Sequence, residues 1–391
     1  MISRPPALAS PAKRSWRRHV IQLLVLGALA AVITLLIRAL KYNLADQGIH
    51  FSFDYLFEVA GIPISEGRTL RMLHGWPVLS DYLPADLNSQ ALLTGLFNTI
   101  SVSLLAIIAA TVLGVSAGLG RFSSNWLLRK MCFGFVEAFR NTPLLVQLMF
   151  WYFGVLLQLP PINAAAHILG AITISVQGIS APGLEPLLPA GIGVTICLVA
   201  VLLWLLTNAS RHVTSRSRRI LLWLTVAFVV LALAPAVPLK IDYPVLGRFQ
   251  ELGGAKISPE MAGLLLAISI NSAAYIAEIV RGAIDSLPIG QWEASASLGL
   301  TRSDTLRQVI LPQAVKIVLP SLGNQYISLT KNTSLGIAVG FPELFNVTGT
   351  IANQTGRSLE GFLILMVTYL LLGTMISFAV NSANSKALRS G

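Results

Sequence analysis

Residues 285–304 read Asp-Ser-Leu-Pro-Ile-Gly-Gln-Trp-Glu-Ala-Ser-Ala-Ser-Leu-Gly-Leu-Thr-Arg-Ser-Asp and lie between two long apolar stretches. The residues after Pro288 favour a helix over 291–298, and Gly299 is suited to end it because glycine tolerates left-handed backbone angles. Thr301 then begins a second helix, since a threonine followed three positions later by an acidic residue resembles a capping box. The stretch therefore predicts two short helices joined by a glycine bend.

We call residues 285–312 the elbow. Its second helix must end or kink at Pro312, because proline lacks the amide hydrogen that a helix interior needs. Trp292, Ala296 and Leu300 give the elbow an apolar side. On shape alone, an interfacial linker helix, which most polytopic membrane proteins have, would explain the segment equally well.

The composition places the elbow in a membrane protein. Of 391 residues, 54% are hydrophobic and 12% are charged, whereas water-soluble proteins carry roughly 25% charged residues. A membrane helix needs about 20 mainly apolar residues, and eight stretches qualify or come close. They are residues 20–40, 92–119, 131–159, 188–206, 220–237, 261–280, 317–344 and 361–380. A further apolar stretch, 164–180, is shorter and contains Gln177 and Gly178, which favours a loop or interfacial segment.

The charges between these stretches predict the orientation. Basic residues without acids occupy the N-terminal tail and the loops after the second and fourth stretches, whereas residues 41–91 hold six acidic and three basic residues. Because cytoplasmic loops carry an excess of Lys and Arg, this distribution puts both termini in the cytoplasm. We read residues 20–40 as an uncleaved anchor rather than a signal peptide, because no convincing cleavage site follows. The expected fold is an all-α polytopic membrane protein with about eight spans.

Catalytic chemistry has no support in the sequence. The two cysteines lie inside apolar runs and the five histidines are scattered, so we expect no catalytic residue, no metal site and no cofactor in this chain. No G-x-x-x-x-G-K-[ST] loop is present, so ATP would have to be handled by another subunit. The formal net charge of +11 reflects loop charges rather than a nucleic-acid partner.

The elbow matches a spaced pattern. Glu293-Ala-Ser, three residues, Gly299, nine residues and Val309-Ile-Leu-Pro follow E-A-A-x3-G-x9-I-x-L-P, with Ser295 and Val309 as small departures. This resembles the EAA loop in permease subunits of ATP-binding-cassette (ABC) importers. The resemblance implies that the first elbow helix docks on a cytoplasmic ATPase. The residues that it assigns to ATPase coupling are Gln291, Trp292, Glu293, Ala294, Ser295, Gly299 and Pro312.

Further segments resemble permeases for polar amino acids. Residues 275–284 follow Y-x-A-E-I-x-R-G-G-I with Ala283 for the second Gly, residues 137–147 contain F-R-N-T-P-L-L-V-Q, and residues 331–335 read K-N-T-S-L.

The extra first helix and the insertion resemble the larger general L-amino-acid permeases of the Aap/Bzt type, which implies a type I ABC importer permease fold. The expected layout is a cytoplasmic basic tail (1–19), an extra N-terminal transmembrane helix (20–40), a periplasmic loop (41–91), the first core part (92–159), an insertion with two transmembrane helices (160–260), the second core part (261–382) containing the elbow, and a cytoplasmic tail (383–391).

Charged and polar groups inside the spans usually face a partner or water, because burying them in lipid is costly. Glu137 with Arg140, and Glu278 with Arg281, are three residues apart, so each pair can form on one helix face. We interpret both as structural ion pairs rather than as a gate that opens and closes a transport path. The pair of Glu278 with Arg281 would stabilise the end of the sixth span, directly before the elbow. Gly114 and Gly118 have G-x-x-x-G spacing, which is compatible with packing against a second permease.

Residues 317–344 form an unusually polar span. A zwitterionic amino acid needs donors and acceptors at mid-membrane, so we hypothesise that polar residues of three spans line a translocation path. Lys331 could instead reach towards a membrane surface or pair with an acid. The path residues are Thr142, Gln147, Asn271, Tyr275, Asn324, Ser328, Lys331, Asn332 and Thr333.

These features together predict the membrane subunit of an importer that carries L-amino acids across the bacterial inner membrane. The expected partners are a cytoplasmic ABC ATPase dimer, a second permease subunit that is a paralogue, a periplasmic amino-acid-binding protein and the lipid membrane. The alternative is a stand-alone secondary amino acid transporter driven by an ion gradient, which should show internal repeats that are not clear here. A membrane enzyme or channel is a third class, and neither a nucleophile–base constellation nor a repeated filter motif supports it.

Overall fold

A computed structural model describes residues 11–46, 51–73, 76–168, 171–186, 239–246 and 251–389. The chain divides into two compact units, Met1–Phe53 and Asp54–Gly391. In the first unit, α1 (Pro11–Asp46) is one helix of 36 residues, and it contains the predicted first span. All elements described below belong to the second unit.

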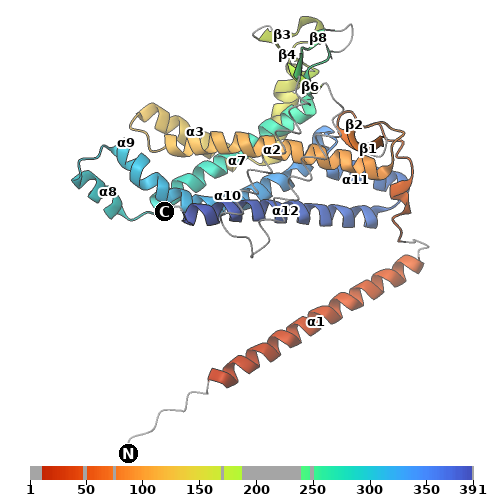
Figure 1. The fold of residues 1–391 in the computed structure, drawn as a ribbon, viewed down its shortest axis with the longest axis horizontal. Helices are drawn as coiled ribbons and strands as arrows, with labels where there is room; N and C mark the ends of the chain where they lie inside the picture. Colours follow the sequence, from red (N-terminus) through yellow and green to blue (C-terminus); the bar gives the residue numbers. More distant parts are fainter. Residues whose placement is uncertain are drawn as a thin grey trace, which may run out of the picture. The chain divides into compact units, whose positions relative to one another are not determined.

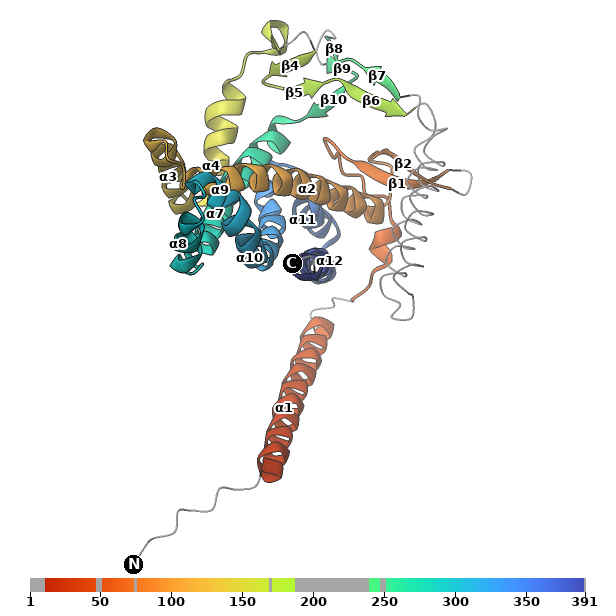
Figure 2. The same cartoon turned by 60° about the vertical axis from the view of Figure 1, so that its left-hand side comes forward.

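The described part of the second unit is mainly helical. Helices α2, α7, α10 and α12 run alongside one another, with the elbow helices at one end and α11 with the β1–β2 hairpin at the other (Figure 1, Figure 2). The α-helices are α2 (Asn88–Gly120), α3 (Trp126–Asn141), α4 (Leu144–Met149), α7 (Pro259–Asp285), α8 (Ile289–Ser297), α9 (Arg302–Thr305), α10 (Leu311–Asn332), α11 (Leu344–Thr355) and α12 (Ser358–Arg389). The 3₁₀ segments are Asp54–Phe57, Leu156–Gln158, Ile162–Ala164 and Thr333–Val339, and the π segments are Phe150–Val155 and Leu306–Ile310.

Three helices of the described part are long and apolar enough to cross a membrane: Asn88–Gly120, Pro259–Asp285 and Ser358–Ser385. They contain the second, sixth and eighth predicted spans. A fourth is present if Arg302–Val339 and Leu344–Thr355, which are bent by 53°, form one span. The fourth and fifth predicted spans, 188–206 and 220–237, lie outside the described residues. The described helices therefore do not establish eight spans.

The predicted third span, 131–159, is not one helix. Helix α3 ends at Asn141, α4 begins at Leu144, and between them Thr142 is extended with φ −96° and ψ 129°. The break has a local cause, because a proline such as Pro143 disfavours helical backbone angles at the residue before it. The predicted third stretch is therefore interrupted, and α3 and α4 are separate helices.

The predicted seventh span, 317–344, also differs. Helical backbone begins at Arg302 and continues to Val339. It stops at Gly340, which has φ +80°, and α11 is a separate helix. The helical stretch therefore begins and ends earlier than predicted, and a bend of 53° leads from it to α11.

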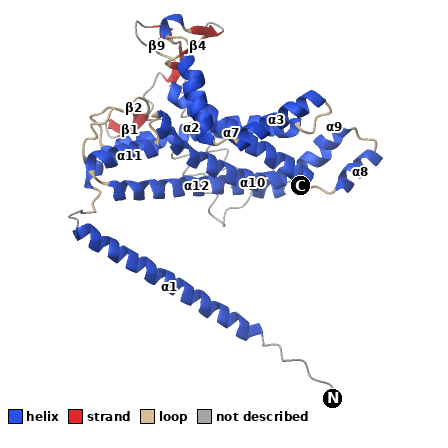
Figure 3. Cartoon of the chain, turned by 180° about the vertical axis from the view of Figure 1, so that it is seen from behind, coloured by secondary structure: helices blue, strands red, loops and turns tan. Residues whose placement is uncertain are grey.

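The described part of the chain is mostly helical, as expected, but it is not all-α, because it also contains strands. Antiparallel strands form a β1–β2 hairpin, a four-stranded sheet in the order β10-β5-β4-β3, and two further pairs (Figure 3). The stretch 164–180 forms three of these strands. Ile172–Ser175 alternates between partly buried and buried residues, a period of two that isoleucine and threonine favour in strands. The strands are β1 (Arg68–Leu73), β2 (Trp76–Asp81), β3 (Ala166–Ile168), β4 (Ile172–Ser175), β5 (Gly178–Ala181), β6 (Gly183–Pro186), β7 (Leu239–Asp242), β8 (Val245–Leu246), β9 (Glu251–Leu252) and β10 (Ala255–Ile257).

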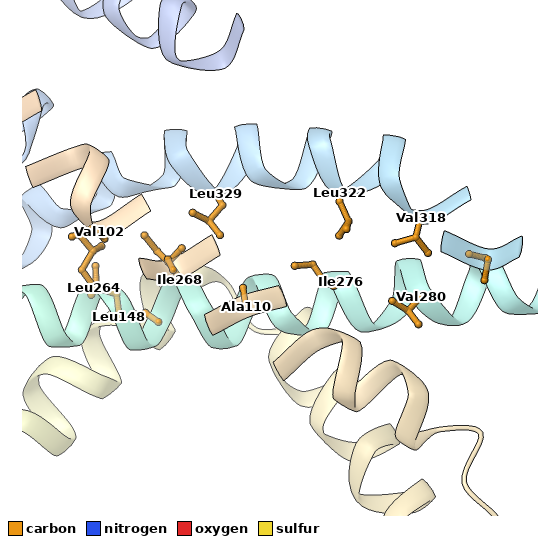
Figure 4. Packing of buried hydrophobic residues seen from close by; sticks show 14 of the residues in the cluster. Val102, Ala110, Leu148, Leu264, Ile268, Ile276, Val280, Val318, Leu322 and Leu329 are labelled. Atoms are coloured by element: carbon orange, nitrogen blue, oxygen red, sulfur yellow. The ribbon is translucent and has the colours of Figure 1, made fainter. Parts of the chain in front are cut away.

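Helix α7 lies at the centre of the core. In its most apolar window 67% of residues are buried, against 28% for α2 and 6% for α12. Ile268 and Ile276 of α7 meet Leu322 and Leu329 of α10 in one hydrophobic cluster, to which α2 adds Val102 (Figure 4). Polar groups carried by α7 are therefore held in fixed positions relative to α2 and α10.

Two glycines let α2 approach α7 closely. A Cβ on Gly114 would lie 2.6 Å from the Ile276 Cβ, and a Cβ on Gly118 would lie 2.9 Å from the Ala277 carbonyl oxygen. This G-x-x-x-G pair is therefore used inside the chain. Helix α7 covers the face of α2 that carries these glycines, so this face is not the one that would contact a second permease.

The segment 54–87 is folded against the start of α2. Arg71 Nη2 donates to both carboxylate oxygens of Asp86, at 2.7 and 2.8 Å. The amide of Asn98 on α2 donates to the Glu66 carbonyl at 3.0 Å, and the hydroxyl of Ser258, the residue that caps α7, donates to the Glu66 carboxylate. Burial raises the pKa of Glu66 above its ordinary value. The segment therefore joins the starts of α2 and α7.

Candidate functional site

The first elbow helix, α8, ends in a Schellman motif. Gly299 has φ +76°, and its amide donates to the Ala296 carbonyl at 2.9 Å. The Leu300 amide donates to the Ser295 carbonyl at 3.1 Å. These two bonds satisfy carbonyl groups that the helix end would leave free. The predicted glycine stop is confirmed.

The second elbow helix begins as predicted. Thr301 Oγ1 accepts a bond from the Asp304 amide at 3.2 Å and donates to the Asp304 carboxylate at 2.6 Å. The helix does not end at Pro312. It passes through a π segment, Leu306–Ile310, directly before α10, and a π segment is one way for a helix to accommodate an interrupted hydrogen-bond ladder.

The elbow covers a cavity of about 540 Å³. The predicted apolar side of the elbow, Trp292, Ala296 and Leu300, lines this cavity together with apolar residues at the ends of α2 and α7. Gln313 Nε2 of α10 donates to Gln291 Oε1 at 3.2 Å. Because close-packed interiors resist displacement, this hollow leaves room for α8 to shift against the membrane helices.

The outer face of α8 is open. Leu298, at the end of the helix, is 81% exposed, and Glu293 and Ala294 are also exposed. Ile289, although 73% exposed, lines the cavity instead. Ser295 is buried, and its hydroxyl donates to the Gln291 carbonyl at 2.7 Å. Among the residues predicted to couple to an ATPase, Glu293 and Ala294 are thus exposed. Ser295 and Gly299 instead form hydrogen bonds that stabilise the helix and its end.

A second cavity, of about 560 Å³, lies where α3 breaks from α4. Its walls come from this break, from α7 and from α10, so segments far apart in sequence meet at this hollow. The lining residues are Arg140, Asn141, Thr142, Pro143, Leu144, Asn271, Tyr275, Gln325, Ser328 and Asn332. Five of the nine predicted path residues line it, namely Thr142, Asn271, Tyr275, Ser328 and Asn332.

The break between α3 and α4 is held by side-chain amides. Gln147 Nε2 donates to the carbonyls of Phe139 and Thr142, at 2.8 and 2.9 Å. Asn271 Nδ2 of α7 donates to the same Phe139 carbonyl at 3.1 Å, and the Tyr275 hydroxyl donates to the Arg140 carbonyl at 3.4 Å. Gln147 is therefore a buried support for the cavity wall rather than part of the lining.

Three predicted path residues are not brought into this cavity. Asn324 and Lys331 are exposed on α10 and are not in the lining, and Thr333 is buried with its hydroxyl bonded to the Thr330 carbonyl at 2.8 Å. Sequence reasoning also missed wall residues. The lining residues that were not assigned to the path are Arg140, Asn141, Pro143, Leu144 and Gln325. The signal that could have revealed the helix break is a proline inside an apolar stretch.

Glu278 of α7 gathers three arginines. Its carboxylate accepts from Arg121 Nη1 at 2.6 Å and from Arg281 Nε at 3.0 Å, and Arg140 Nη1 lies 3.5 Å away. Arg281 also donates to Asp285 at 2.5 Å. We call these five residues the Glu278 cluster. It joins the end of α2, the end of α3 and the base of α7 to the start of the elbow.

The two predicted ion pairs have different outcomes. The pair of Glu278 with Arg281 is confirmed. The pairing of Glu137 with Arg140 is wrong, because Arg140 is directed to Glu278, and Glu137 instead accepts from Asn141 Nδ2 at 3.0 Å. Packing of α3 against α7 makes a cross-helix partner available that helical spacing alone does not reveal. Among the described residues, no group of three His, Cys, Asp or Glu side chains could hold a metal ion.

Comparison with known proteins identifies the class. Residues 110–390 match the family described as binding-protein-dependent transport system inner membrane component. This match covers most of the chain, and the chain belongs to that family.

Curated relatives match nearly the whole length. The chain is 35% identical to the putative amino-acid ABC transporter permease protein YhdX of Escherichia coli, over 97% of this chain and 95% of that protein. It is 34% identical to the general L-amino acid transport system permease protein AapQ of Rhizobium johnstonii, over 95% and 92%. Among solved structures, a crystal structure of an amino acid ABC transporter with histidines covers 76% of this chain and 94% of its own, at 21% identity and a TM-score of 0.47.

The elbow bend gives a matched test. Gly299 and Gly290 both have open space at the Cβ position, but only Gly299 has a positive φ. We expect Gly299→Ala to weaken the end of α8 by about 1–2 kcal/mol, the cost of a left-handed non-glycine residue, and Gly290→Ala to leave the helix intact. Hydrogen exchange of the α8 amides in the full chain measures both. Equal exchange in the two variants would contradict the role given to the bend.

Proposed function

We propose that this chain is the membrane-spanning subunit of an ABC importer that moves L-amino acids across the bacterial inner membrane. The observation that carries the proposal is the elbow, an outward-facing helix with an open face, held over a hollow at one end of the membrane helices. A separate ATPase would dock on this face and hydrolyse ATP, because the chain has no phosphate-binding loop of its own. The relatives are ABC transporter permeases, which favours this proposal over an ion-driven secondary transporter.

We propose the topology that the loop charges predict. Both termini would lie in the cytoplasm with eight spans, two of them in the insertion 160–260. The segment 54–87 and the strands would face the periplasm, where an amino-acid-binding protein would deliver substrate. A second permease, a paralogue of this chain, would complete the membrane part, and an ATPase dimer would complete the cytoplasmic part.

We propose the cavity at the α3–α4 break as a substrate site. A free amino acid presents a carboxylate and an ammonium group. The Arg140 guanidinium and the side chains of Ser328 and Asn332 suit the carboxylate, and backbone carbonyls at the end of a broken helix suit the ammonium group. Arg140 also contacts Glu278 at 3.5 Å, so occupancy of the cavity would be felt by the Glu278 cluster.

The ATPase proposal is tested on the open face of α8. We expect Glu293→Lys to abolish co-purification of this chain with its ATPase, because it reverses a charge on the docking helix. Glu58→Lys makes the same change at an exposed residue before the start of α2, a 33-residue helix that separates it from the elbow by about 50 Å of helix. Loss of the ATPase in both variants, or in neither, would contradict docking through α8.

The cavity proposal is tested on two asparagines of α10. We expect Asn332→Leu to reduce amino acid uptake at least about fivefold, the loss of one hydrogen bond of about 1 kcal/mol. Asn324→Leu, outside the lining, should have the smaller effect. Uptake is measured per assembled complex, so that failure to assemble is not mistaken for failure to transport. Equal uptake by the two variants would remove this cavity from the path.

A further inference from the structure

A basic hollow lies beside the turn that joins α2 to α3. It has a volume of about 280 Å³ and is lined by four basic side chains, Arg121, Arg129, Lys130 and Arg281, with one acid, Asp285. Phenylalanines complete the wall, and the Arg121 guanidinium lies over the ring of Phe133 at 5.4 Å. The lining therefore carries more positive than negative charge.

Hydrogen bonds and close helix packing define the turn that shapes this hollow. Asn125 caps α3, with its Oδ1 accepting from the amides of Leu127 and Leu128 at 2.9 and 3.2 Å. A Cβ on Gly120 would overlap Cys132 Sγ, so α2 and α3 are in close contact directly beside the hollow. The basic residues are thus presented from a fixed scaffold rather than from a long loop.

Within the described ranges, two of the four cations are not neutralised by carboxylates. Arg121 and Arg281 are bound to Glu278. The exposed Arg129 donates to a neutral group, the Ser123 carbonyl, at 3.0 Å, and forms no ion pair with another described residue. Lys130 is also exposed and forms no ion pair within the described part of the chain. Two positive charges therefore remain available to an anion at this hollow.

Apolar side chains surround these charges. On the same helix, Trp126 and Met131 are each 63% exposed and Leu127 is 57% exposed. Basic residues beside exposed tryptophan and aliphatic residues are typical of a helix at the boundary between lipid headgroups and acyl chains. The long apolar helix α2 ends at Gly120, which places the hollow at that depth.

We propose that this hollow binds the phosphate headgroup of an anionic phospholipid. Arg129 and Lys130 would contact the phosphate, and the acyl chains would lie against the apolar side chains that begin with Trp126. Basic pockets between membrane helices are known to accommodate such headgroups. Phe122 and Asp285 line both this hollow and the elbow cavity, so the lipid belongs to the leaflet on the elbow side. Only the naming of that leaflet as cytoplasmic rests on the proposed function.

The test is native mass spectrometry of the purified full-length chain in detergent, with added phosphatidylglycerol or phosphatidylcholine. We expect the chain to retain phosphatidylglycerol more strongly. The double variant Arg129→Gln, Lys130→Gln should lower the affinity at least fivefold, since each basic residue near a membrane surface contributes about 1 kcal/mol. Both side chains are exposed, so the double variant should keep the wild-type melting temperature.

A second double variant serves as the matched control. Arg307→Gln with Lys316→Gln removes the same charge from the π segment Leu306–Ile310 and from α10. Neither residue lines the hollow, so this variant should keep the wild-type affinity. The proposal is overturned by equal losses in the two double variants or by equal binding of the two lipids. It is also overturned if inorganic phosphate displaces the lipid at low millimolar concentration. A first double variant that keeps lipid but no longer co-purifies with the ATPase would overturn it too, because this turn would then be a protein interface.

Discussion

The structure depends on one carboxylate shared among three helix ends. Glu278 accepts from Arg121 at the end of α2 and from Arg281 one turn along α7, and it lies 3.5 Å from Arg140 near the end of α3. Its side chain is 25% exposed, so water screens each pair, and a single pair would stabilise the fold only modestly. Glu278 matters because three arginines share its one carboxylate. Without Glu278, three guanidinium groups would lie close together with too few acceptors.

This arrangement connects lining residues of the two cavities through ion pairs. Arg140 lines the cavity at the α3–α4 break, and Asp285, bonded to Arg281, lines the cavity beneath the elbow. Ion pairs therefore run from Arg140 through Glu278 and Arg281 to Asp285, from the wall of one cavity to the wall of the other. Connected networks of this kind can couple distant sites. The close approach of α2 to α7 at Gly114 keeps the remaining part of the interface rigid.

The sequence correctly predicted features that depend on neighbouring residues. It failed where contacts between segments distant in sequence determine the structure. The glycine stop at Gly299 and the cap at Thr301 depend on neighbouring residues, and both are present in the structure. Asn324, Ser328 and Lys331 of α10 were all predicted to line the path, but the rotation of the helix is set by burial of Leu322 and Leu329. Ser328 faces the cavity, while the other two do not. The strands were missed because alternation over four residues is a weak signal beside long apolar runs.

The most direct measurement is the number of amino acids imported per ATP hydrolysed, with the complete importer reconstituted in proteoliposomes. For Glu278→Gln we expect ATP hydrolysis to continue while import falls, so that the ratio drops several-fold. Glu137→Gln removes a carboxylate from the adjacent α3 without touching the Glu278 cluster and should keep the wild-type ratio. An unchanged ratio in Glu278→Gln, in complexes that assemble normally, would contradict the claim that this carboxylate connects the elbow to the cavity.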